Sequence, residues 1–62
     1  MKTLKELRRG YVIEGKPMTQ KILGSRFDVP QSTVTNWERD SSRIPTEVLP
    51  RLCRLFDVKG IA

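Results

Sequence analysis

Residues 19–40, TQKILGSRFDVPQSTVTNWERD, constrain the fold of this chain more than any other segment. They contain two short amphipathic stretches separated by a bend, and their apolar spacing predicts one helix over about 20–27 and another over about 31–39. Thr19 suits the N-cap of the first helix, and Pro30 suits the first turn of the second. Two helices joined by a turn of about three or four residues form a helix-turn-helix.

The remaining residues must complete a core without covalent cross-links. The chain has 62 residues and no histidine, and Cys53 is its only cysteine, so we expect neither an internal disulfide nor a zinc site. Apolar periodicity predicts two further helices, over about 3–13 and about 47–56, and no strand. Pro50 fits the last helix only in its first turn. We therefore expect a single all-α domain covering residues 1–62.

Apolar residues at helical spacing mark the expected core. Trp37 and Val34, three residues apart, form the inner side of the segment 31–39. The expected core residues are Leu4, Leu7, Tyr11, Ile22, Leu23, Phe27, Val34, Trp37, Val48, Leu49, Leu52, Leu55 and Phe56. Gly24 lies in mid-helix, which predicts a close approach by the backbone of another helix. Asp28 follows at the turn, where we expect a left-handed conformation.

The balance of charges favours a polyanionic partner. Twelve Lys and Arg residues against seven Asp and Glu residues give a net charge of +5, and such an excess attracts phosphate groups. No apolar run approaches the roughly 20 residues that span a bilayer, and the N-terminus lacks the apolar stretch of a signal peptide. We therefore expect a cytoplasmic protein that does not bind membranes.

Nothing in the sequence indicates catalysis. The serines, threonines and aspartates occur without any histidine, and the chain has neither a nucleophile–base pair nor a glycine-rich phosphate loop. We therefore expect no enzyme activity, no cofactor, no bound metal and no small-molecule ligand.

A row of uncharged polar residues remains on the outer side of the segment 31–39 when Val34 and Trp37 point inwards. This polar row consists of Gln31, Ser32, Thr35 and Asn36. Their amides and hydroxyls both donate and accept hydrogen bonds, as the edges of base pairs require, and Gln or Asn can pair with adenine through two bonds. The polar row is therefore a candidate for reading bases in the major groove, although an ordinary polar helix surface would have the same composition.

Several residues of this region together resemble one known family, the Cro and lambda-repressor family of helix-turn-helix DNA-binding domains. The resemblance spans about 18–58 and rests on Thr19, Gln20, Gly24, Val29, the run TVTNWER at 33–39, and Pro45. It implies a compact bundle of four to five helices whose third helix enters the major groove. Gln31, Ser32 and Asn36 occupy the base-reading places of that helix.

The resemblance also implies contacts to the DNA backbone. In the family, a Gln at the start of the second helix contacts a phosphate, and the end of the third helix with the following loop grips the backbone. The residues in or beside these places are Thr19, Gln20, Lys21, Thr33, Arg39, Ser41, Ser42 and Arg43. The Glu that matches Glu38 pairs with an Arg of the first helix. Arg8 and Arg9 are both candidates, and the long connection after that helix leaves the choice open.

These expectations define a predicted function. We expect a sequence-specific regulator of transcription, a repressor that binds double-stranded DNA as a homodimer on a palindromic operator. Leu55 and residues 58–62 would contribute to the dimer, unless the chain is a fragment of a longer protein. The alternative is an antitoxin or another protein-interaction module that uses the same bundle.

Overall fold

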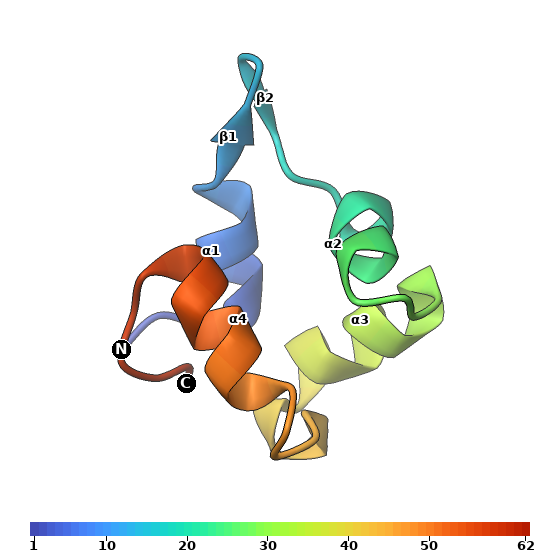
Figure 1. The fold of residues 1–62 in the computed structure, drawn as a ribbon, viewed down its shortest axis with the longest axis vertical. Helices are drawn as coiled ribbons and strands as arrows, with labels where there is room; N and C mark the ends of the chain where they lie inside the picture. The colour runs from blue at the N-terminus through green and yellow to red at the C-terminus, as the bar shows by residue number, and fades with distance from the viewer.

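The computed structural model describes residues 1–62 as four α-helices, one short hairpin and one 3-10 turn (Figure 1). In chain order the elements are α1 (Leu4–Arg9), β1 (Val12–Ile13), β2 (Lys16–Pro17), α2 (Gln20–Arg26), α3 (Gln31–Arg39), η1 (Ser41–Arg43) and α4 (Leu49–Phe56). The hairpin projects from one end of the molecule, and α4 lies beside α1 (Figure 1). The predicted all-α bundle is confirmed in part, for its four helices and its central helix-turn-helix. No fifth helix follows α4.

The first helix, α1, is shorter than the sequence predicts. It begins with a capping box, in which the Glu6 N–H donates to Thr3 Oγ1 at 3.2 Å and the Thr3 N–H donates to the Glu6 carboxylate at 3.0 Å. It ends at Arg9 with Gly10 as its C-cap, and not near residue 13. Glycine has a low helix propensity, and the β-branched residues that follow favour a strand.

The strands β1 and β2 form an antiparallel hairpin, so the prediction of no strand was wrong. Ile13 pairs with Lys16 across a two-residue loop, and the loop residues Glu14 and Gly15 have φ angles of 52° and 80°. Positive φ at both positions is what a type I′ turn needs, and glycine adopts such angles without strain. Strands of two residues are too short for an alternating pattern to be visible in the sequence.

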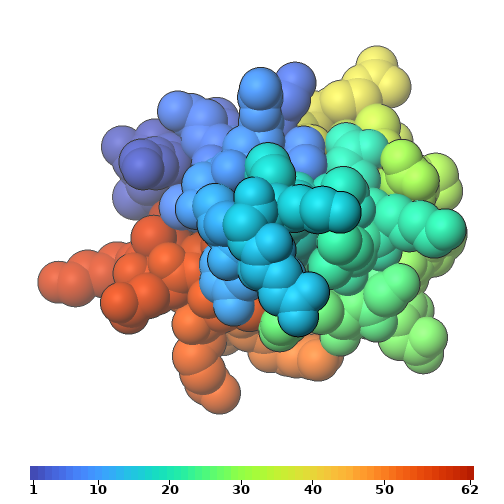
Figure 2. All heavy atoms as spheres, turned by 90° about the horizontal axis from the view of Figure 1, so that it is seen from above, coloured from blue at the N-terminus to red at the C-terminus, as the bar shows by residue number.

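The hairpin returns the chain to the bundle close to the place where it left. The Met18 N–H donates to the Tyr11 carbonyl oxygen at 2.8 Å, and Met18 is buried. Figure 2 looks down on the hairpin (blue to cyan), which lies nearest the viewer between the C-terminal residues (red) and α2 (green). The long connection between α1 and α2 is therefore accommodated outside the core.

The helices α2 and α3 form the predicted helix-turn-helix. Thr19 caps α2 as expected, since its Oγ1 accepts a hydrogen bond from the Ile22 N–H at 3.1 Å. The helix ends at Arg26, close to the predicted boundary, and Asp28 adopts the predicted left-handed conformation with a φ of 55°. Pro30 precedes α3 as its N-cap and does not lie in its first turn.

The backbone that approaches Gly24 belongs to the turn and not to another helix. A Cβ atom at this position would lie 2.7 Å from the Val29 carbonyl oxygen and 3.5 Å from Val34 Cγ2. The Val29 N–H also donates to the Gly24 carbonyl oxygen at 2.9 Å. The close approach was therefore predicted, but its partner was not.

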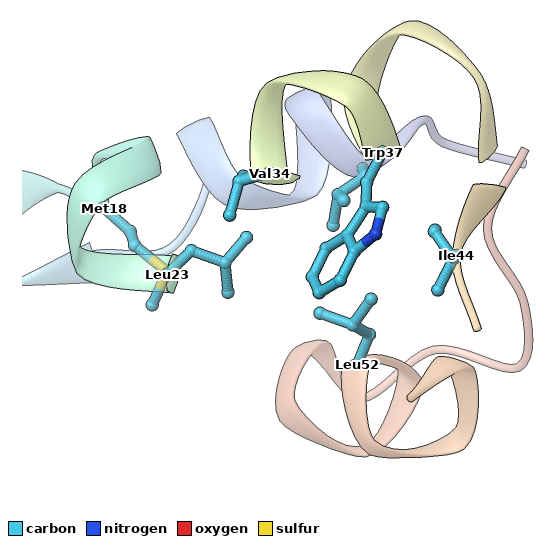
Figure 3. Close-up of a cluster of buried hydrophobic side chains, with 7 residues drawn as sticks. Met18, Leu23, Val34, Trp37, Ile44 and Leu52 are labelled. Atoms are coloured by element: carbon cyan, nitrogen blue, oxygen red, sulfur yellow. The ribbon is translucent and has the colours of Figure 1, made fainter. Parts of the chain in front are cut away.

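Seven buried side chains form the core, and they come from every part of the bundle (Figure 3). They are Leu4, Met18, Leu23, Val34, Trp37, Ile44 and Leu52. Trp37 extends from α3 toward Leu52 of α4 (Figure 3), and the Phe27 ring meets the indole edge-on, with the centroids 6.4 Å apart. Trp37 therefore packs α3 against both the end of α2 and α4.

Three core assignments differ from the sequence prediction. Met18 and Ile44 are buried without having been predicted, because both lie in segments outside the helices, where no periodicity indicates the inward side. Ile22 was expected in the core but is 42% exposed. Leu23 occupies the inward position of α2, and the residue next to it on a helix points about 100° away.

The last helix, α4, begins at Leu49, slightly later than predicted, with Pro50 in its first turn. Proline is tolerated there because the N–H groups of the first turn have no partner within the helix. Only Leu52 is fully buried in α4. The remaining residues expected to be buried in this helix are half-buried: Val48, Leu49, Leu55 and Phe56.

The chain ends lie close together. The Ala62 N–H donates to the Lys2 carbonyl oxygen at 2.9 Å, and nearby the half-buried Tyr11 ring packs edge-on against Phe56 with the centroids 5.7 Å apart. Tyr11 was expected on the buried stripe of a longer first helix; it instead lies beyond the end of α1. No helix in the structure has the length and apolar character needed to cross a bilayer.

Candidate nucleic-acid interface

The outer side of α3 carries the polar row. Val34 is fully buried and Trp37 is 4% exposed, which turns the opposite side of the helix to solvent. Of the polar row, Gln31, Ser32 and Asn36 are exposed and Thr35 is half-buried. Gln31, Ser32 and Asn36 can therefore reach an external partner, whereas Thr35 lies closer to the bundle.

Gln20, the first residue of α2, links this row to the rest of the bundle. Its Nε2 donates to Glu38 Oε1 at 2.9 Å. Its Oε1 accepts hydrogen bonds from Thr35 Oγ1 at 3.1 Å and from Gln31 Nε2 at 3.4 Å. Because Glu38 accepts from Nε2, the carbonyl oxygen of Gln20 faces α3, and Gln31 keeps its own Oε1 and one Nε2 hydrogen for another partner.

Glu38 is paired inside the bundle and does not face solvent. Arg8 Nε lies 2.6 Å from Glu38 Oε2, and Arg8 Nη2 lies 3.4 Å from Oε1. The side chains of Arg8 and Glu38 are only 11% and 5% exposed. A third guanidinium nitrogen, Nη1, donates to the Met18 carbonyl oxygen at 2.9 Å. Of the two candidates, Arg8 is therefore the partner, and Arg9 is exposed.

The loop after α3 forms a second, more polar surface. Asn36, Arg39, Asp40 and Arg43 line an open hollow of about 410 Å³ with no apolar residue in its wall. Arg39 and Arg43 are exposed. Their guanidinium groups give this end of α3 a local excess of positive charge, although Asp40 partly offsets it.

Asp40 is a residue of this surface that the sequence analysis missed. Its Oδ1 accepts hydrogen bonds from Ser42 Oγ at 2.7 Å and from the Ser42 N–H at 3.1 Å, and these bonds lower the pKa of the Asp40 carboxyl group. Arg43 Nε lies 3.9 Å from Oδ2. An Asp followed two residues later by a hydrogen-bonding partner is typical of an Asx turn, which was the available signal.

The other residues predicted to contact phosphate lie in two groups. At the start of α2, Thr19 and Lys21 are exposed, and Thr19 Oγ1 is also the cap acceptor of the helix. At the far end, Ser41 is half-buried in η1, and Ser42 is exposed with its hydroxyl donating to Asp40. Thr33 is half-buried in the first turn of α3.

The arrangement of α2, its turn and α3 defines a helix-turn-helix domain of the kind that binds DNA. The family model described as Helix-turn-helix matches residues 16–60. The chain therefore belongs to this family, the lambda-repressor-like helix-turn-helix DNA-binding domains, and the resemblance drawn from the sequence is confirmed. No curated protein and no solved structure matches the chain.

Proposed function

We propose that this chain is a sequence-specific regulator of transcription that inserts α3 into the major groove of double-stranded DNA. The observation that carries the proposal is the exposed polar row, with Gln31 hydrogen-bonded to Gln20 of the neighbouring helix. The uncharged polar row matches the hydrogen-bonding edges of bases, and the net charge of +5 matches the phosphates that flank them.

Gln31 is the residue best prepared to read a base. After donating one hydrogen to Gln20, its side chain still offers one acceptor and one donor. These two groups match the N6 donor and the N7 acceptor of adenine. Thr35 Oγ1 lies within hydrogen-bonding distance of Gln20 Oε1 and the Gln31 carbonyl oxygen. Because the hydroxyl is engaged within the chain, the Thr35 methyl group would be the part that contacts a thymine methyl group.

Asn36 and Ser32 supply the rest of the base-reading face. Neither side chain forms a hydrogen bond within the chain, so both keep their full donor and acceptor capacity. Asn36 would pair with a second adenine, and Ser32 would bond to several bases. Two bidentate contacts, each worth about 1–3 kcal/mol of discrimination, would suffice for a preferred site.

Phosphate contacts on both sides of α3 would set the register of the helix in the groove. Lys21 and the Thr19 hydroxyl would contact one phosphate group near the start of α2, and Gln20 has a second Nε2 hydrogen for the same purpose. The residues that would contact the backbone at the other end are Arg39, Ser41, Ser42 and Arg43, and Thr33 would do so from the first turn of α3. The internal pairing of Glu38 with Arg8 keeps that acid from repelling the DNA.

We further propose that the chain acts as a homodimer on a palindromic operator and represses by covering a promoter. In this class of domain, two recognition helices enter successive major grooves about one helical turn apart. Binding of that kind excludes other proteins from the same stretch of DNA without any effector or second domain.

Selection of preferred sites from a random duplex library tests the proposal. We expect an enriched sequence with two-fold symmetry, in which the centres of the half-sites lie about 10 base pairs (one helical turn, about 34 Å) apart. A failure to enrich any sequence would reject sequence-specific binding, and an enriched sequence without symmetry would reject the homodimer.

A Gln31→Ala variant tests the role assigned to α3. It should weaken binding to the selected site by about 1–3 kcal/mol and leave binding to random DNA nearly unchanged, because only base contacts are lost. The measurement is a titration of both duplexes by fluorescence anisotropy. Lys5→Ala, an exposed change on α1, is the matched control. It should change the affinities for both duplexes only slightly and by the same amount.

The salt dependence of binding separates this function from the antitoxin alternative. Neutralising several phosphates makes the affinity fall steeply as salt rises, whereas binding to a protein partner through the same face would respond weakly. A weak salt dependence of the affinity for the selected duplex would favour the antitoxin alternative.

A further inference from the structure

A second hollow in the surface lies between the end of α2 and the middle of α4. Arg26, Phe27, Arg51, Arg54 and Leu55 line a hollow of about 360 Å³. We refer to it as the arginine groove. Three of its five residues are arginines, and the other two supply an aromatic ring and an aliphatic side chain. In Figure 2 the end of α2 (green) and α4 (orange) meet at the lower edge of the molecule.

The charges of the arginine groove are not neutralised within the chain. The two ion pairs of the structure join Arg8 to Glu38 and Arg43 to Asp40, and neither involves a residue of the groove. The arginines of the groove, Arg26, Arg51 and Arg54, are all exposed. Three guanidinium groups around one hollow, without an acid in its wall, are complementary in charge to an anionic partner.

Arg51 is held in place by the aromatic ring. Its Cζ lies 4.9 Å from the centroid of the Phe27 ring, and the Phe27 ring in turn packs edge-on against Trp37. A guanidinium group that is stacked in this way loses less conformational freedom when it binds a carboxylate. The groove is therefore partly pre-organised for an acidic side chain.

The arginine groove shares no residue with the polar row. Trp37 lies between α3 and Leu52 of α4 (Figure 3), so α3 and α4, which carries three of the five groove residues, are on opposite sides of the indole. Stacking of an unpaired base is disfavoured, since Arg51 already covers a face of the Phe27 ring.

We propose that the arginine groove binds a short acidic amphipathic segment of another protein. Its carboxylates would pair with Arg26, Arg51 and Arg54, and one apolar side chain would lie against Phe27 and Leu55. A volume of about 360 Å³ accommodates a few side chains of such a segment. This surface is separate from the DNA-binding face of the proposed function, so the regulator could hold both partners at once.

The experiment uses a fluorescein-labelled peptide in which pairs of Asp alternate with single Leu or Phe residues. Anisotropy titrations at physiological salt should show binding to the wild-type chain. The double variant Arg51→Glu and Arg54→Glu should weaken that binding by about tenfold or more, because attraction becomes repulsion. A peptide with Ser in place of Leu and Phe should also bind more weakly, because the apolar wall loses its partner.

The matched control is the double variant Lys5→Glu and Lys59→Glu, which makes the same change in net charge at exposed sites outside the groove. It should change peptide binding far less than the groove variant does. An equal loss in the two variants would show diffuse attraction to a basic chain and would overturn the proposal, as would no binding of the peptide by the wild type.

DNA binding by the same variants provides a second test. Binding to a random duplex should fall equally in the groove variant and in the control. A larger fall in the groove variant would assign the groove to the DNA backbone and overturn the proposal.

If the double variant fails to fold, Arg54→Glu alone replaces it, since Arg54 forms no ion pair or stacking contact in the structure. About a threefold or greater loss of peptide binding is then expected.

Discussion

At the scale of single residues, Glu38 shows how one carboxylate connects the interior to the polar row. It accepts hydrogen bonds from Arg8 Nε, Arg8 Nη2 and Gln20 Nε2. Gln20 then accepts from Gln31 on the outer side of α3. A series of polar contacts therefore runs from Arg8 of α1 to the residue that we expect to read a base, and its geometry depends on the charge pair with which it begins.

Removing one partner of this pair should be costly. Arg8→Ala leaves the nearly buried Glu38 carboxylate without its cation, and breaking a buried pair in this way costs about 3–5 kcal/mol. Urea unfolding followed by circular dichroism measures the loss. Arg9→Ala, the neighbouring exposed arginine, should change the free energy of unfolding by less than about 0.5 kcal/mol. Similar values for the two variants would contradict the structural role of Arg8.

At the scale of elements, the contact between α2 and the turn decides how α3 is presented. The Val29 carbonyl oxygen comes so close to Gly24 that no side chain fits between them. Asp28 makes this possible by adopting a left-handed conformation directly after the end of α2. The angle of α3 is therefore set by backbone contacts and not only by the apolar side chains beneath it.

A Gly24→Ala variant tests this contact. Helix propensity alone would stabilise the protein by about 1 kcal/mol. The new Cβ would lie 2.7 Å from the Val29 oxygen, however, and the forced displacement should make the variant less stable by about 1–3 kcal/mol. Thermal unfolding checks the sign, with the exposed change Ser25→Ala in the same helix as the control. A stabilised Gly24→Ala variant would show that the turn yields easily.

At the scale of the whole molecule, one aromatic side chain, Trp37, joins α3 to the end of α2 and to α4. Nine of the 62 residues are buried, and a chain of about 60 residues buries only roughly 60% of its unfolded surface. The stability of such a domain is therefore small, and Trp37, which meets Phe27 and extends toward Leu52, contributes a large part of it.

Trp37→Ala should therefore strongly destabilise the domain. Replacing a buried aromatic residue by alanine costs about 3–5 kcal/mol, which approaches the total stability of 5–15 kcal/mol that is usual for folded domains. Far-ultraviolet circular dichroism of the purified variant measures the remaining helix content. Ile22→Ala, at a site that is 42% exposed, is the control and should remain folded. A Trp37→Ala melting curve like that of the wild type would contradict the central place of the indole.

The sequence was most informative where apolar periodicity was strong. The spacing of Val34 and Trp37 predicted which side of α3 is buried, and Thr19 and Asp28 predicted how α2 begins and how the turn bends. Prediction failed between residues 10 and 18, because Gly10 ends α1 and a hairpin of two-residue strands carries no recognisable pattern.

The candidate site, like the fold, could be predicted from the sequence only in part. The identity and outward direction of the polar row could be read from local spacing, because a helix fixes the angle between successive side chains. The choice of Arg8 over Arg9, the bond from Gln20 to Gln31 and the arginine groove join residues far apart in the chain. No spacing rule within one element contains that information.

The sequence by itself determined the helix-turn-helix and the residues that its second helix exposes, since both depend on interactions within a few residues. The tertiary structure alone decided how Glu38 is neutralised, how Gln31 is oriented and which arginines share one groove. Those properties depend on the packing of α1, α2, α3 and α4 around Trp37, where small rotations of a helix change the partner that a side chain can reach.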